Sequence, residues 1–504
     1  MEKPIEKVVI AGGGSAGFLA ALSFRILLPK IELVVVHSAD IPVIGVGEST
    51  TQAFVDYLHT ILRVDRGELI REVRPSWKLG LRLEWGDPVD THFNYPFERF
   101  LDKTVGSLEK VQAFYCLDGM TDSSHYGALM DRVLSPCRLQ DGRVAMDPRA
   151  TYHIPNRQFI DYLQRKVQQL GAQVIDGEIV AVDRRDSGDV KRLRLKDGRE
   201  IEGDLFVDCT GFGSLLLGET MGAKFGSYSD TLFCDAAVIG SWQRPEDDTD
   251  VRPYTTVETM DHGWCWRIDF LDIVTRGYVF STAFCSPDEA MREMKAKNPA
   301  LGDDLRLIRF PSGRYDRFWV GNVAGVGNSS GFVEPLEATA LHLIISQTWY
   351  LIAAIRDGGR RPSEALKAIE NRRFEKTWDD VRDFLALHYR LNRRLDTPFW
   401  RHCRENTSLG GAEELVAAYA ETGPAVALGE LITAASIFGY TGYINLLVGQ
   451  RAPTKVRTRL TEDESRLWQA HCQQIREAIR PALPVKEALR RVYDEARYWP
   501  REGI

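Results

Sequence analysis

The sequence lacks the features that mark membrane and secreted proteins. Its longest apolar run, residues 341–355, is interrupted by His342 and by polar residues at 346–348, so it is too short and too polar to span a membrane. The charged N-terminus leads straight into the apolar residues from Val8, without the pattern of a signal peptide. We therefore expect a cytoplasmic protein with no membrane partner.

Signatures of metal and nucleic-acid binding are also missing. The eight cysteines include no Cys-x-x-Cys pair and the ten histidines no His-Glu-x-x-His pattern, so no metal site is expected. Without a secretory signal, the cysteines should be reduced thiols. The net charge is -7 and no segment is strongly basic, which argues against a nucleic-acid partner.

What the chain does contain is enough apolar residues for a large core. It has 504 residues, of which 44% are hydrophobic and 27% are charged, and this balance excludes disorder over most of the length. At about 150 residues per domain, the length predicts roughly three folding units.

The chain opens with a strand–helix–strand pattern. Residues 8–11 and 31–36 have the pattern of buried strands, and residues 18–28 have a helical pattern between them. Further buried strands are expected at residues 205–208 and 318–326. This alternation predicts an α/β fold with a Rossmann-like core.

Other segments interrupt and extend this core. Residues 225–310 are rich in β-branched and aromatic side chains, which predicts an inserted antiparallel sheet, and helical patterns dominate from Leu341. We expect residues 1–345 to form a nucleotide-binding module with β-rich insertions at about 75–150 and 225–310. Residues 346–504 should form a mainly helical, substrate-binding region packed on this module.

Residues 77–85 alternate between apolar and polar side chains, which predicts a single half-buried strand. Lys78 lies on the polar side of this pattern. From the alternation alone we expect Lys78 to be exposed, because lysine is rarely buried.

A glycine-rich turn follows the first strand. Gly12-x-Gly14-x-x-Gly17 is typical of dinucleotide-binding folds: Gly12 allows the tight turn, Gly14 lets the backbone approach a pyrophosphate, and Gly17 lets the helix pack close to the strand. Ser15 and Ala16 begin the helix, whose N-terminal N–H groups favour phosphate binding. We expect these residues to bind the cofactor.

The acidic residue that usually ends the second strand is absent. His37 and Ser38 stand there instead, so the usual hydrogen bond from a carboxylate to the ribose is not predicted. Ser38 is a candidate cofactor contact, and Asp40 is a candidate substitute for the acid.

Two more glycine turns close strands far downstream. One contains Asp208 and Gly211, and the other contains Gly327 and Asn328. Three such strand ends resemble the FAD-dependent oxidoreductases of the glutathione-reductase and hydroxylase type, in which several segments wrap one FAD. The sequence shows no second strand–Gly-x-Gly-x-x-Gly–helix unit for a nicotinamide nucleotide.

A set of further motifs spans most of the chain. They are Gly45-Val-Gly-Glu-Ser-Thr50, Trp77-Lys78, Gly263-Trp-Cys-Trp-Arg-Ile268, Phe332-Val-Glu-Pro-Leu-Glu-Ala-Thr339, His388-Tyr389 and Asp396-Thr-Pro-Phe-Trp400. In this order they resemble the flavin-dependent tryptophan halogenase family. The resemblance implies that a separate NAD(P)H-dependent flavin reductase supplies reduced FAD. Oxygen and a halide, chloride or bromide, would then serve to halogenate an electron-rich aromatic such as an indole derivative.

The resemblance also implies catalytic roles for Lys78 and Glu337. In that family, hypohalous acid travels through an internal tunnel to a lysine, which Lys78 matches; an ammonium can polarise the acid, and a neutral amine can form a haloamine. Glu337 matches the glutamate that positions the halogen donor or takes the proton of the arenium ion. The alternative for Glu337 is a helix-start residue that only complements the helix dipole.

Thr339 and Ala340 match the helix start at which the family binds halide through backbone N–H groups. The usual Ser-Thr-Gly reads Ala338-Thr339-Ala340 here, and alanine cannot adopt every glycine conformation, so the halide preference stays open. Glu48 lies in the stretch matched to the loop beside the flavin, and we expect it to link the cofactor and halide sites.

Trp264 and Trp266 match the two tryptophans thought to keep the substrate away from the flavin, and we expect both to line the substrate pocket. The alternative is that they simply fill a sheet core. The family motif ends in Ile-Pro, whereas this chain has Ile268-Asp269, so the following turn is expected to differ.

The C-terminal region lacks the Tyr-Tyr…Glu…Phe-Trp stretch by which free-tryptophan halogenases hold the amino acid. Residues 438–443 occupy its place. We expect Tyr440, Tyr443 and Trp400 to line the substrate pocket, and a simple indole or a larger peptide- or carrier-linked aromatic to be the substrate.

Two other functions stay open at this point. The protein could be an FAD-dependent aromatic monooxygenase that inserts oxygen, or a non-catalytic flavin-binding protein. The pairing of Lys78 with Glu337 argues against both. Nothing in the sequence distinguishes a monomer from a homodimer.

Overall fold

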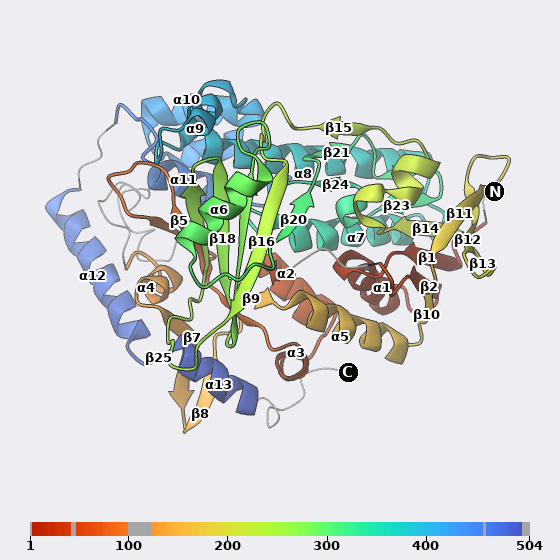
Figure 1. The fold of residues 1–504 in the computed structure, drawn as a ribbon, viewed down its shortest axis with the longest axis horizontal. Helices are drawn as coiled ribbons and strands as arrows, with labels where there is room; N and C mark the ends of the chain where they lie inside the picture. The colour runs from red at the N-terminus through yellow and green to blue at the C-terminus, as the bar shows by residue number, and fades with distance from the viewer. Residues whose placement is uncertain (1–2, 42–46, 99–121, 457–459, 496–504) are drawn as a thin grey trace.

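The chain begins in a six-stranded sheet with the order β10-β2-β1-β14-β23-β22. A computed structural model describes residues 3–41, 47–98, 122–456 and 460–495. The strands of this sheet are β1 (Lys7–Ala11), β2 (Glu32–His37), β10 (Gln173–Asp176), β14 (Leu205–Asp208), β22 (Trp319–Val320) and β23 (Val323–Gly325). All neighbours are parallel except β22 and β23. The predicted Rossmann-like α/β core is therefore confirmed, and it lies at the right of Figure 1.

Both faces of this sheet are covered. Val8 and Ile10 of β1 belong to the main hydrophobic core, whereas Val9 and Ala11 pack against a small three-stranded sheet. The main core includes residues of α1 (Ser15–Leu27), α5 (Asn156–Gln169) and α7 (Thr339–Asp357), and the small sheet consists of β11 (Ile179–Arg184), β12 (Val190–Leu195) and β13 (Glu200–Glu202). Strands covered on both faces read as continuous apolar runs, as β1, β2 and β14 do.

A seven-stranded sheet stands beside the first one in the order β20-β16-β19-β18-β17-β5-β6 (Figure 1). Its strands are β5 (Gly80–Glu84), β6 (Phe93–Pro96), β16 (Ala236–Gln243), β17 (Thr255–Met260), β18 (Gly263–Asp269), β19 (Ile273–Phe280) and β20 (Arg306–Arg309). Only β17 and β5 run parallel. The antiparallel sheet predicted for residues 225–310 thus exists, and it is extended by strands from the first insertion.

A three-stranded antiparallel sheet connects the motif that contains Glu48 with Lys78. It contains β3 (Glu48–Ser49), β9 (Thr151–Ile154) and β4 (Ser76–Lys78), with β9 in the middle. The single strand predicted for residues 77–85 is therefore wrong, because β4 ends at Lys78 and β5 begins at Gly80 in another sheet. Residues 318–326 likewise form two short strands, since Gly321 adopts a positive φ of 55° between them.

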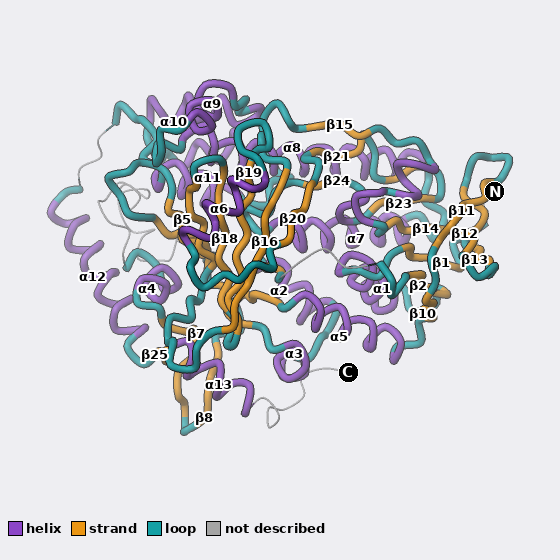
Figure 2. Tube along the Cα trace, in the orientation of Figure 1, coloured by secondary structure: helices purple, strands orange, loops and turns teal. Residues whose placement is uncertain are grey.

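Helices surround the sheets (Figure 2). The C-terminal ones are α8 (Glu364–Leu391), α9 (Pro398–Asn406), α10 (Glu413–Thr422), α11 (Gly439–Gly449), α12 (Glu462–Ile479) and α13 (Val485–Glu495). The others are α2 (Gln52–Asp56), α3 (Arg66–Val73), α4 (His125–Asp131) and α6 (Pro287–Lys297). The short strands are β7 (Leu134–Gln140), β8 (Arg143–Met146), β15 (Phe225–Ser227), β21 (Gly313–Tyr315), β24 (Gly331–Phe332) and β25 (Ala482–Pro484).

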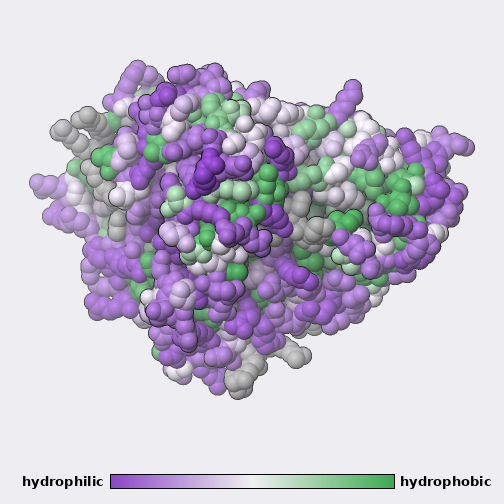
Figure 3. Space-filling model, in the orientation of Figure 1, coloured by the Kyte–Doolittle hydropathy of each residue, from purple (hydrophilic) through white to green (hydrophobic). Residues whose placement is uncertain are grey.

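The surface agrees with the composition. The face shown in Figure 3 is mainly hydrophilic, with hydrophobic side chains scattered between polar ones. In the part of the chain that the structure describes, we find no helix with the length and apolar character that a membrane span needs.

Candidate active site

Three glycine turns meet at the carboxyl edge of the six-stranded sheet. Gly12 (φ +115°) follows β1, and a Cβ atom there would lie 2.2 Å from the carbonyl oxygen of Cys209, which follows β14. Gly327 (φ +72°) follows β23, and a Cβ there would lie 2.9 Å from the Cβ of Ala16 on α1. The turns therefore contact one another, as a site that wraps one dinucleotide with several segments requires.

The turn between β1 and α1 is open where a pyrophosphate would lie. A Cβ on Gly14 would meet nothing within 4 Å, and no side chain caps this end of α1. In contrast, a Cβ on Gly17 would lie 1.9 Å from the Gly12 carbonyl oxygen. Gly17 is thus required by the fold, whereas Gly14 leaves space and backbone N–H groups for phosphate, so these residues fit an FAD.

Asp208 shapes the second turn from within. Its buried carboxylate accepts hydrogen bonds from the backbone N–H groups of Thr210 at 2.9 Å and of Leu216 and Leu217 at 2.8 Å each. A Cβ on Gly211 (φ +76°) would meet nothing within 4 Å. Gly211 therefore borders open space, while the carboxylate of Asp208 is used by the turn itself.

The ends of β2 and β23 complete the cofactor edge. His37 packs its ring against Phe18, with the centroids 5.8 Å apart, and leaves room only for a glycine at position 13. Ser38 and Asn328 are half-buried, and Asp40 is exposed. Ser38 and Asn328 stay candidate cofactor contacts.

Replacing Gly14 with valine should abolish FAD binding without unfolding the protein. The added side chain would enter the open space that the pyrophosphate needs, and its Cβ would meet no protein atom within 4 Å. Gly17→Val should instead destabilise the fold, because its Cβ would overlap the backbone of Gly12. Titration with FAD and thermal melting of both variants check this; tight FAD binding by folded Gly14→Val would contradict it.

Lys78 is completely buried at the end of β4, so the exposed position expected from the alternation is wrong. Its Nζ lies 4.4 Å from the centroid of the Phe97 ring and has no hydrogen-bond partner among the described residues. Burial lowers the pKa of Lys78 to about 7, and the charge of Glu337 acts in the opposite direction. Near neutral pH, Lys78 is therefore present both as an ammonium and as a free amine.

Glu337 is buried just before α7 and is held by a histidine. Its Oε1 lies 2.7 Å from Nε2 of His388, which is itself completely buried on α8. The other ring nitrogen of His388 lies 3.2 Å from the Phe384 carbonyl oxygen. Because the Glu337 carboxylate is close enough to act on the pKa of Lys78, the structure brings these two residues into one site.

The first turn of α7 follows Glu337 directly. Ala338 adopts a left-handed conformation (φ 56°) before the helix, and Thr339 and Ala340 are the first helical residues. No side chain caps this helix end. The positive φ thus falls on Ala338 and not on Ala340. Alanine at position 340, where the family has glycine, therefore requires no unusual backbone conformation, and the helical N–H groups of Thr339 and Ala340 stay in place.

A buried carboxylate ties the two-tryptophan motif to the segment that carries Glu337. The indole N–H of Trp264 donates to Oε2 of Glu334 at 2.8 Å, and the hydroxyl of Tyr389 donates to the same oxygen at 2.5 Å. Burial raises the pKa of Glu334 to about 7. The ring of Trp266 lies over Gly277, where a Cβ would be 1.9 Å from it. Both tryptophan rings are therefore held in fixed positions.

The three other aromatic residues predicted to line the substrate pocket differ in their surroundings. Trp400 lies in the core, where its indole N–H donates to the Met260 carbonyl at 2.7 Å and its ring stacks on Tyr389. Tyr443 donates to Asp380 at 2.9 Å and packs its ring on Phe384, and Tyr440 is half-buried. Tyr443 thus adjoins the Glu337–His388 pair through Phe384, whereas Trp400 supports the site from the core.

Glu48 begins β3, next to Ile154 of β9. Burial raises the pKa of Glu48 to about 7, so this carboxyl can exchange a proton near neutral pH. Gly45 and Val46, which open the same motif, lie outside the described residues.

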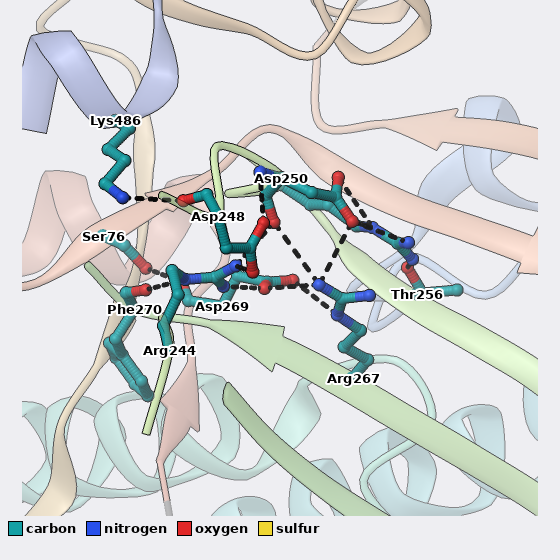
Figure 4. A network of polar contacts seen from close by, with 10 residues as sticks. Ser76, Arg244, Asp248, Asp250, Thr256, Arg267, Asp269, Phe270 and Lys486 are labelled. Atoms are coloured by element: carbon teal, nitrogen blue, oxygen red, sulfur yellow. Dashed lines mark hydrogen bonds and ion pairs between the residues drawn. The ribbon is translucent and has the colours of Figure 1, made fainter. Parts of the chain in front are cut away.

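A network of charged side chains anchors β4 (Figure 4). The hydroxyl of Ser76, two residues before Lys78, donates to the Asp269 carbonyl at 2.6 Å. The buried Asp269 carboxylate pairs with Arg244 and with Arg267, the latter at 2.9 Å. The Lys486 ammonium of α13 donates to the Asp248 carbonyl at 2.7 Å. Residue 269 therefore joins β18 to the strand of Lys78 through its backbone carbonyl, and the carboxylate that a proline would lack holds the two arginines.

Sequence reasoning missed several residues of this site. His388 and Glu334 stand inside the quoted motifs, where a buried ion-pair partner could have been suspected. Phe97 stands outside every motif, and no local pattern marks it.

The glycine turns on a Rossmann-like sheet place the chain among dinucleotide-binding α/β proteins. A family model described as tryptophan halogenase matches residues 7–465. The chain therefore belongs to the tryptophan halogenase family, and it is a flavin-dependent halogenase.

Relatives and solved structures agree over most of the length. The tryptophan 7-halogenase RebH of Lentzea aerocolonigenes is 31% identical over 451 residues, which cover 83% of this chain and 82% of that protein. The crystal structure of MibH, a lanthipeptide tryptophan 5-halogenase, superposes with a TM-score of 0.87 and 34% sequence identity. The match covers 97% of this chain and 94% of the MibH chain. Xcc4156, a flavin-dependent halogenase from Xanthomonas campestris, is 26% identical with a TM-score of 0.87 over 100% of both chains.

Proposed function

We propose that the protein attaches chlorine or bromine to an indole derivative, with Lys78 delivering the halogen. The observation that carries this proposal is the completely buried Lys78, which has no hydrogen-bond partner among the described residues and whose pKa is affected by the charge of Glu337. An unpaired buried amine destabilises a fold, so its presence is best explained by a reaction that needs it.

The chain's residues divide the work between two places. The turns at Gly14, Gly211 and Gly327 hold FAD. The chemistry that reduced FAD provides when bound, together with oxygen, is the oxidation of halide to hypohalous acid. The first N–H groups of α7, at Thr339 and Ala340, hold the halide. We infer that a separate flavin reductase provides the reduced cofactor, because the sequence shows no second nucleotide-binding turn.

At the second place, Lys78 and Glu337 act on the aromatic substrate. The Lys78 ammonium donates a hydrogen bond to the oxygen of hypohalous acid and makes its halogen more electrophilic. The halogen bonds to a ring carbon, and the oxygen leaves as water with a proton from Lys78. The Glu337 carboxylate, oriented by His388, accepts the proton that the same ring carbon loses. The net change is replacement of a ring hydrogen by halogen, with one water formed.

We further propose that the indole belongs to a tryptophan within a peptide. MibH, a solved relative, is named for a lanthipeptide tryptophan. In this chain Phe438 stacks on Phe384 with centroids 3.7 Å apart, and Tyr443 is engaged with Asp380. The part of the chain where free-tryptophan halogenases hold the amino acid is thus occupied by contacts within the protein.

Competing substrates test this proposal. Free tryptophan, indole and a tryptophan-containing peptide amide, at equal concentrations, are incubated with the protein, FAD, NADH, oxygen, bromide and a separate flavin reductase. Brominated peptide should form fastest, and without the reductase NADH oxidation should be negligible. Faster bromination of free tryptophan would contradict the peptide assignment, and rapid NADH oxidation by the chain alone would contradict the two-component assignment.

A further inference from the structure

A buried histidine shares a sheet face with Lys78. In the sheet of β3, β9 and β4, His153 lies opposite both Ser49 and Ser76, and Lys78 lies opposite Thr151. Opposite residues and alternate residues of a strand point to the same side of a sheet. The side chains of Ser49, Ser76, Lys78, Thr151 and His153 therefore face one side, next to Thr255 of β17.

Most polar groups on this face have partners within the protein. The Ser76 hydroxyl donates to the Asp269 carbonyl, and the Thr151 hydroxyl donates to the Lys78 carbonyl. Nε2 of His153 lies 2.8 Å from the hydroxyl of Thr255. Among the described residues, two buried atoms of this face lack a hydrogen-bond partner: Nδ1 of His153 and Nζ of Lys78.

The two side chains are neighbours on this face, because the charge of Lys78 acts on the pKa of His153. Diagonal neighbours on antiparallel strands, as Lys78 and His153 are, lie about 7–8 Å apart and are within reach of long and aromatic side chains. Both residues are 0% exposed. A buried polar atom without a partner is destabilising, and two of them on one face indicate a place for a polar guest.

The imidazole of His153 is suited to accept a hydrogen bond. Burial and the neighbouring charge of Lys78 hold the pKa of His153 well below its ordinary value, so the ring stays neutral. A neutral imidazole has one donating and one accepting nitrogen. If Nε2–H donates to Thr255, then Nδ1 is the acceptor.

We propose that His153 is a further residue that binds hypohalous acid at Lys78. Nδ1 of His153 accepts the O–H of the acid while the Lys78 ammonium donates to its oxygen, so the halogen points away from both and toward the substrate. No covalent change occurs at His153. This inference rests on the function proposed above for Lys78. One bound molecule of hypohalous acid would give a hydrogen-bond partner to both Nδ1 of His153 and Nζ of Lys78.

Two amide substitutions separate this role from a structural one. Asparagine places its side-chain amide near the position of Nδ1, and glutamine places its amide near Nε2. His153→Asn should keep the acceptor for hypohalous acid and lose the Thr255 contact, whereas His153→Gln should do the reverse. His59→Gln is the control, because the His59 ring contacts Tyr152, whose side chain lies on the opposite face of β9.

The readouts are halogenated product per reduced FAD oxidised, hypohalous acid captured by a trap in solution, and thermal melting. We expect His153→Gln to lower product per flavin about tenfold to hundredfold, with a matching rise in trapped acid and unchanged flavin oxidation. His153→Asn should retain most of the coupling, and His59→Gln should retain all of it.

Two outcomes would overturn the proposal while wild-type protein still halogenates: unchanged coupling in His153→Gln, or a greater loss in His153→Asn than in His153→Gln. The second outcome would mean that His153 serves only to hold Thr255. Absence of halogenated product from wild-type protein would instead refute the proposed function itself.

Discussion

Lys78→Ala should eliminate halogenated product while reduced FAD still reacts with oxygen at a nearly normal rate. The glycine turns lie at the edge of the six-stranded sheet, whereas Lys78 ends a strand of another sheet and is tied to the seven-stranded sheet through Ser76 and Asp269. Removing its amine therefore leaves the cofactor site intact. Lys78→Arg should also fail, because a guanidinium does not lose its proton near neutral pH and does not match the geometry of an ammonium.

Product analysis together with stopped-flow spectra of the flavin checks this expectation. Lys78→Met supplies the structural control, because it fills the same buried space without charge. The folded-state pKa of about 7 lies below the ordinary value of 10.5, so the buried ammonium destabilises the fold most below pH 7. Lys78→Met should therefore raise the melting temperature most at low pH, and this gain should shrink as the pH rises toward 10.5. Undiminished halogenation by Lys78→Ala would refute the role of Lys78.

Glu337→Gln should lower the rate of halogenation strongly but leave a measurable remainder. Glutamine keeps the size of the side chain and one oxygen toward His388, but it cannot accept the proton of the ring carbon. Loss of a general base typically costs about a hundredfold to ten-thousandfold in rate. Single-turnover product formation with excess enzyme measures this step apart from flavin reduction.

Glu334→Gln is the matched control for that experiment. Glu334 stands on the same segment, is equally buried, and can keep its contacts to Trp264 and Tyr389 through the amide oxygen. Its loss of rate should be much smaller than that of Glu337→Gln. Equal losses in the two variants would show that the segment tolerates no neutral side chain, and the role of Glu337 as base would then lack support.

The cofactor half of the site could be predicted from the sequence because its determinants are local. Gly12, Gly14 and Gly17 act within one turn, and the apolar strands around them indicate a sheet covered on both sides. The meeting of Gly327 with α1 required the three-dimensional structure, although the sequence already showed the glycine turn.

The substrate half could be predicted only through resemblance. The alternating pattern around Lys78 suggested an exposed side chain, because residues 77–85 look like one strand when they form two strands in different sheets. The break at Leu79 is a tertiary effect: its N–H bonds to the carbonyl of Pro253, which is distant in sequence. His153 and Phe97 reach Lys78 by similar long-range pairing, which no local pattern encodes.

The central claim is that this chain transfers halogen, and not oxygen, to an aromatic ring. Mass spectrometry of the products formed from a tryptophan-containing peptide tests it most directly, with reduced FAD and oxygen present and chloride, bromide or neither added. We predict a product with the isotope pattern of the added halogen, and no product when halide is omitted. A halide-independent product carrying one added oxygen would contradict the account and identify the protein as a monooxygenase.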